Sequence, residues 1–69
     1  MRIPDIQTRI TEIAEDAGGG DNEAAHGKED LLLEDALRDI AAGAGYLSPQ
    51  DLAREVIKVF DIDYERWYV

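Results

Sequence analysis

AAHGKEDLLLEDALRDIAAGAG, residues 24–45, is the longest stretch of the sequence with one consistent helical period. At about 100° per residue, six of its side chains fall on one stripe of a helix: His26, Asp30, Leu33, Leu37, Ile40 and Ala44. We expect this stripe to face the core, with Leu32, Ala36 and Ala41 beside it. The stretch predicts a helix over residues 23–42, around which the other segments pack. Gly27 weakens its first turn, which leaves a start at Lys28 open.

The opposite side of this predicted helix is charged, as expected for a solvated face. It carries Lys28, Glu34, Asp35, Arg38 and Asp39. Leu31 is an exception, an apolar side chain among these charges. We expect it to pack on the first helix, predicted over residues 4–17, or to contact a partner. The predicted partner-binding surface therefore consists of Leu31, Glu34, Asp35, Arg38 and Asp39.

Two shorter segments have the periodicity of flanking helices. Over residues 4–17, isoleucines recur at 3-4 spacing between a proline suited to the first turn and three glycines that end the helix. Residues 49–60 follow Ser48, a predicted cap, and have a broad apolar face. We expect a short aromatic turn over residues 63–68, capped by Asp63, to place Trp67 on the core. The predicted fold is an all-α, small three-helix domain with this C-terminal turn docked on it.

The composition fits one small domain. The chain has 69 residues and no cysteine, so disulfides and thiolate metal sites are excluded and a single core gives marginal stability. The isoleucine seam therefore has two open interpretations, an intramolecular core or a homodimer interface. No apolar run approaches the roughly 18 residues of a membrane span, and the N-terminal stretch has no signal-peptide core. We expect a cytoplasmic protein without membrane contact.

The formal net charge is −9, from 7 Lys and Arg against 16 Asp and Glu. Such a field repels nucleic acid and attracts basic partners, so we expect no direct nucleic-acid binding. Solubility is the simplest interpretation of this charge. A second is a DNA mimic, in which spaced carboxylates imitate a phosphate row and inhibit a nucleic-acid-binding enzyme.

His26, followed by Glu29 and Asp30 at helical spacing, is the one group of side chains that resembles a chemical site. A metal or general-base role needs further ligands or a triad partner, and the chain has no second histidine. We therefore expect His26, Asp30 and Trp67 to form a structural polar cluster. We expect no metal, no cofactor and no enzymatic activity.

Several short motifs carry a resemblance to a known group of proteins. They are Ala25-His26, Glu29-Asp30-Leu31, Leu37-Arg38 and the terminal IDYERWY of residues 62–68. They resemble short proteins of actinobacteria and their phages, which have a His-x-x-x-Asp helix and end in an aromatic-x-Arg/Lys-Trp-Tyr/Cys-Ala pattern. The resemblance covers about residues 24–69 and omits the isoleucine helix. This chain departs from the pattern at Gly27 and at Val69, where alanine is usual.

The resemblance implies a small phage-encoded accessory protein and no particular chemistry. In that group the His–Asp end of the helix occurs together with the C-terminal tryptophan. This implies that His26 or Asp30 contacts Trp67 or Tyr64. We expect the function to be binding and modulation of a host protein through the acidic helical surface, with DNA mimicry as the alternative.

Overall fold

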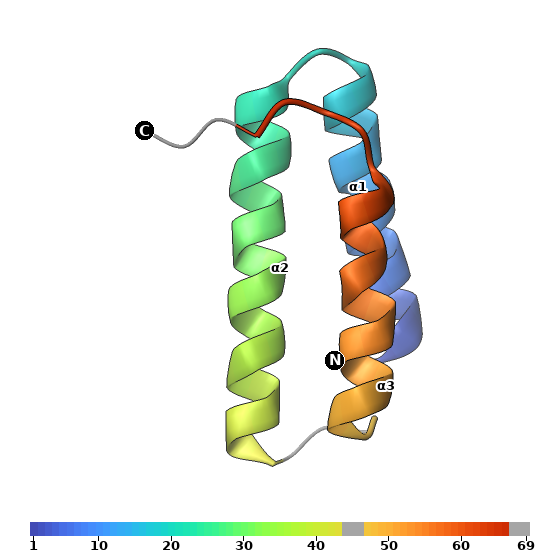
Figure 1. The fold of residues 1–69 in the computed structure, drawn as a ribbon, viewed down its shortest axis with the longest axis vertical. Helices are drawn as coiled ribbons and strands as arrows, with labels where there is room; N and C mark the ends of the chain where they lie inside the picture. The colour runs from blue at the N-terminus through green and yellow to red at the C-terminus, as the bar shows by residue number, and fades with distance from the viewer. Residues whose placement is uncertain (44–46, 67–69) are drawn as a thin grey trace.

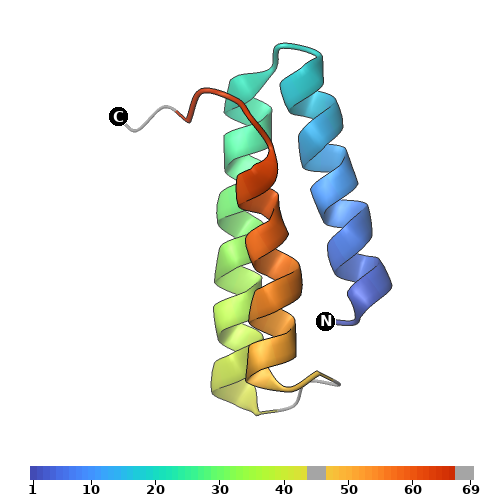
Figure 2. The same ribbon diagram turned by 45° about the vertical axis from the view of Figure 1, so that its right-hand side comes forward.

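The structure, a computed structural model, describes residues 1–43 and 47–66. Helix α1 spans Ile3–Gly18, α2 spans Asn22–Ala42 and α3 spans Pro49–Val56, and a 3-10 helix, η1, continues α3 over Ile57–Asp61. Each helix runs antiparallel to the one before it in the chain. In Figure 1, α3 lies beside α2, and α1 lies behind α3. Figure 2 separates α1 from the other two. The described residues contain no strand, which confirms the all-α, three-helix fold.

The helix ends follow local signals. The Ser48 hydroxyl accepts a hydrogen bond from the Asp51 backbone N–H at 3.1 Å, and Pro49 occupies the first turn of α3. Gly43 ends α2 at φ 64°, a left-handed conformation that favours glycine. A start of α2 at Lys28 is wrong, because Asp21 caps the helix by accepting from the Ala24 backbone N–H.

The third helix is less regular than its apolar pattern predicts. It is α-helical only to Val56, and the next turn tightens into η1, where Val59 is fully buried. The helical turn predicted to begin at Asp63 is wrong within the described residues, because residues 63–66 have no regular secondary structure. Residues 67–69 lie outside the described residues.

The core lies where the three helices meet. Its buried apolar members are Ile6, Ile13, Ala25, Leu32, Ala36, Leu52, Val56 and Val59. Ile10, Ala17, Leu33, Leu47, Ile62 and Tyr64 are among the partly buried side chains that pack against them. The isoleucine seam of α1 is therefore used within this chain as an intramolecular core.

Helix α2 faces the core with a different stripe from the predicted one. Its buried residues are Ala25, Glu29, Leu32 and Ala36, roughly 80° around the helix from the predicted stripe. Leu37 is 68% exposed and Ile40 40% exposed. The predicted orientation is wrong, because the stripe that carries Ala25, Leu32 and Ala36 is the buried one.

Candidate protein-binding groove

Large exposed apolar side chains converge on one face of the domain. Four of the five in the described residues, Leu37, Ile40, Ile57 and Phe60, line a single groove between α2 and the α3–η1 segment. The groove has a volume of about 340 Å³. Its other lining residues are Leu33, Ala36, Leu52, Ala53 and Val56. All nine lining side chains are apolar, which sets this face apart from the charged surface elsewhere.

The two walls of the groove have the same helical spacing. Leu33, Leu37 and Ile40 stand at positions i, i+4 and i+7 of α2, and Ala53, Ile57 and Phe60 repeat this spacing on α3–η1. Seven residues of a helix advance about 10 Å, so each wall is about two helical turns long. The buried side chains of Ala36, Leu52 and Val56 lie between the walls. The result is an apolar trough with parallel edges.

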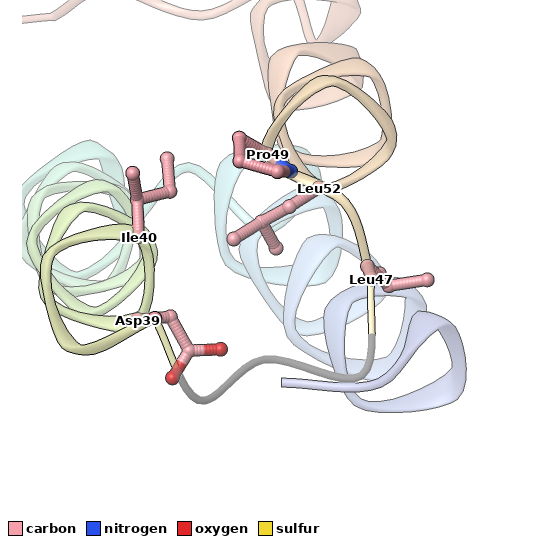
Figure 3. Close-up of a pocket in the computed structure, with 6 residues that line it drawn as sticks. Asp39, Ile40, Leu47, Pro49 and Leu52 are labelled. Atoms are coloured by element: carbon pink, nitrogen blue, oxygen red, sulfur yellow. The ribbon is translucent and has the colours of Figure 1, made fainter.

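A smaller pocket of about 80 Å³ continues the groove toward the end of α2. Ile40 and Leu52 line both cavities. Figure 3 shows Ile40 on α2 facing Pro49 and Leu52 on α3, with the Asp39 carboxylate at the edge of the pocket. The Asp39 carboxylate is in turn paired with the amino group of Met1. The apolar surface therefore extends past Ile40.

Charged residues of α2 that were predicted to form a solvated face instead contact α1. The pairs are Lys28–Asp16 at 2.6 Å, Asp35–Arg9 at 2.8 Å and Asp39 with the Met1 amino group. Hydrogen bonding to Asp16 raises the pKa of Lys28. These pairs form the edge of the α1–α2 seam, so Asp35 and Asp39 contribute to holding the fold together.

The other predicted partner-binding residues lie on the exposed surface. Glu34 and Arg38 pair with each other at 2.7 Å, one helical turn apart. Leu31 is exposed, as the pattern predicts, but it does not line the groove. The structure therefore divides the five predicted residues between the α1 edge and the outer surface, and none of them lines the apolar groove.

Only part of the predicted polar cluster falls within the described residues. The His26 Nε2 lies 3.4 Å from the Asp30 Oδ1, with His26 largely buried and Asp30 exposed. Trp67 lies outside the described residues, so its predicted contact stays a prediction. Burial raises the pKa of Tyr64 to about 12, assisted by the neighbouring Glu29 carboxylate and, more weakly, by Asp30. Asp30 is thus within electrostatic range of Tyr64.

A buried ion pair between Glu29 and Arg66 was missed from the sequence. The Glu29 side chain is 2% exposed, and the Arg66 Nε and Nη2 donate to its carboxylate at 2.9–3.1 Å. Arg66 also donates to the backbone carbonyls of Val59, Ile62 and Tyr64, and its guanidinium lies 4.0 Å from the centre of the Tyr64 ring. The sequence signal was the position of Glu29 on the Ala25–Leu32–Ala36 stripe.

The Arg66–Glu29 ion pair holds the segment that follows η1 against the first half of α2. We call residues 62–66 the C-terminal strap. Figure 1 shows it crossing from the end of η1 to α2. Its crossing lies beyond Leu33 and Phe60, the residues that end the two groove walls at this side. The strap therefore ties α3–η1 to α2 through the Arg66–Glu29 pair.

Other kinds of site find little support in residues 1–43 and 47–66. No group of three or more histidine, aspartate or glutamate side chains there is placed to hold a metal ion. None of the helices in this part of the chain has the length and apolarity needed to cross a membrane. No protein-family model, curated protein or solved structure matches the chain.

Proposed function

We propose that this domain binds a partner protein by receiving one of its α-helices in the groove between α2 and α3–η1. The observation that carries the proposal is the convergence of Leu37, Ile40, Ile57 and Phe60 on two facing walls. A large contiguous apolar patch on the surface of a soluble domain often marks the site where a partner binds. Full burial of a leucine, isoleucine or phenylalanine side chain contributes about 1.5–3 kcal/mol, so four half-exposed ones supply a substantial binding energy.

The shape of the groove favours a helix as its occupant. Its walls lie on antiparallel helices and are about two turns long, so an added helix would occupy the fourth position of a four-helix bundle. Amphipathic helices bind such grooves through anchors at i, i+3 or i+4, and i+7. The wall residues of this domain have that same spacing. The partner would therefore present two or three large apolar side chains along one face.

Charge argues for a different protein as the occupant and against a second copy. Each copy has a formal net charge of −9, so self-association through this face would bring two strongly acidic bodies together. A neutral or basic partner avoids this repulsion. The expected role, a small accessory protein that modulates a host protein, is unchanged. The proposed binding surface is now the groove and not the acidic face of α2. Sequestering the partner's helix is the means of modulation.

DNA mimicry is less well supported than helix binding. It requires free carboxylates in a row, and Asp35 and Asp39 are paired with cationic groups of α1 and the N-terminus. Only Glu34 of the three carboxylates on the predicted face lies away from α1, and it is paired with Arg38.

The proposal is tested with a synthetic amphipathic helix of about 16 residues that has leucines at i, i+4, i+7 and i+11 and neutral polar residues elsewhere. A scrambled peptide of the same composition is the control ligand. We expect the helical peptide to bind, by fluorescence anisotropy and by NMR shifts at the groove. Leu37→Asp should weaken binding at least tenfold because it places a charge in the apolar wall.

Leu31→Asp is the matched control variant. Leu31 is also an exposed leucine of α2, but it lies outside the groove. Equal losses with Leu31→Asp and Leu37→Asp, or no binding of either peptide, would overturn the proposal. A homodimer in sedimentation equilibrium that dissociates in the Leu37→Asp variant would assign the groove to a second copy and also contradict it.

A further inference from the structure

We infer that the helix received by this groove carries basic side chains along the edge that faces α2. This inference rests on the proposed function and adds the chemistry of the partner. The evidence is the charge of the exposed residues that border each wall of the groove, which we call the α2 rim and the α3 rim. The two rims differ in charge although the two walls are similar in spacing and apolarity.

The α2 rim is acidic. Asp30 precedes the wall residue Leu33 by three positions, and Glu34 precedes Leu37 by three. Side chains three residues apart on a helix are neighbours, so these carboxylates border the wall. The Asp30 side chain is 64% exposed and that of Glu34 is 52% exposed. Both can therefore reach a helix lying in the groove.

Of the two rim carboxylates, one has no Lys or Arg partner within the described residues. Arg38 pairs with Glu34, while Asp30 has His26 within 3.4 Å and no Lys or Arg ion pair in the described residues. The formal charge of the whole chain, −9, adds a negative field to the local one. A basic side chain placed here by a partner gains from both.

The α3 rim lacks this excess. The position equivalent to Glu34, three residues before Ile57, is Arg54. Arg54 pairs with Asp51 at 3.3 Å, and Lys58 pairs with Glu55 at 3.0 Å. Each cation on this side is thus balanced by an acid one turn earlier. The inferred preference for basic side chains therefore applies to one edge of the bound helix only. It specifies how that helix is rotated about its own axis, in addition to its composition.

Exposed charge pairs contribute little each, so two of them should change affinity by about tenfold at low salt. The test compares two synthetic peptides that share one leucine ridge. One has lysines and the other has glutamates at the positions flanking a single side of the ridge. Fluorescence anisotropy titrations at low and high salt give the two dissociation constants. We expect the lysine peptide to bind about tenfold more tightly, and the difference to shrink as salt rises.

A pair of variants separates the rim from the net charge. Asp30→Lys with Glu34→Lys should abolish or invert the preference for the lysine peptide. The control, Glu12→Lys with Glu15→Lys, makes the same change in net charge on exposed positions of α1 and should keep most of the preference. Equal loss in both double variants would overturn the inference by assigning the effect to net charge.

The outcomes also distinguish this inference from the proposed function. Equal binding of the lysine and glutamate peptides would overturn the charge preference and leave helix binding in place. Failure of both peptides to bind would overturn both. NMR shifts confined to the groove with the lysine peptide, lost in Leu37→Asp, would support both.

Discussion

The two apolar faces of α2 meet different surroundings. Toward the core, the helix presents Ala25 and Leu32, both fully buried, and the edge of the α1–α2 seam is closed by ion pairs. Toward α3–η1 it presents Leu37 and Ile40, which remain exposed on a groove wall. The face with the smaller side chains is the closed one.

This difference shows that one apolar face of α2 is completed within the chain and the other is not. Side chains buried at the first seam make their dispersion contacts inside the domain. Large side chains on α2 and on α3–η1 stand along the two edges of the second seam and leave space between them. The first seam therefore stabilises the fold, and the second is the one that we propose receives a partner's helix.

The largest effect should come from removing the ion pair that holds the strap on α2, at one end of the α2–α3 seam where the groove lies. We call this the open seam and the α1–α2 seam the closed seam. Arg66→Ala leaves the Glu29 carboxylate buried without its guanidinium, and breaking such a pair costs about 3–5 kcal/mol. Urea unfolding followed by circular dichroism measures the loss. The double variant Glu29→Met with Arg66→Met should recover much of it, because it removes the buried charge as well. Equal destabilisation by the single and double variants would show that the charge is not the cause.

Two leucine truncations on α2 compare the seams directly. Leu32→Ala should lower the free energy of unfolding by about 3 kcal/mol, because Leu32 is fully buried in the closed seam. Leu37→Ala, on the open seam, should change it by less than about 0.5 kcal/mol. Denaturant midpoints of the two variants provide the comparison, and similar losses would mean that the groove is filled in solution.

The aromatic anchor of the strap gives a pH test of the open seam. Since the pKa of Tyr64 is raised from 10.0 to about 12, its stabilising contribution is complete below pH 10 and is lost as pH rises through 12. Partial exposure reduces the effect to less than about 1 kcal/mol at pH 11. Unfolding at pH 9 and pH 11 should therefore differ less in Tyr64→Phe than in the parent chain. An unchanged pH dependence in that variant would remove Tyr64 from this role.

The smallest effect is expected from a substitution that stabilises α2 and leaves the side chains of both seams unchanged. Gly27 lies within the helix, is exposed, and has no heavy atom within 4 Å of where a Cβ would stand. Gly27→Ala should raise stability by about 0.5–1 kcal/mol through helix propensity. Thermal unfolding measures this gain, and peptide binding to the groove should stay unchanged. A loss of stability would indicate that position 27 is packed in solution.

The sequence by itself determined the elements of this fold. Ser48 with Pro49, Gly43 and the glycines at the end of α1 act through backbone geometry and caps, which depend on neighbouring residues alone. The isoleucines of α1 form one apolar seam, and nothing in that helix competes with it. These local signals predicted three helices and most of their ends.

The tertiary structure decided which side of α2 is buried and where the groove lies. The sequence of α2 offers two apolar stripes, and periodicity alone favoured the one with more large side chains. The choice depends on contacts between distant segments, such as the pairing of Asp35 with Arg9, 26 residues away. The burial of Glu29 likewise depends on Arg66, 37 residues away, because a carboxylate is stable in the core only when a distant cation reaches it.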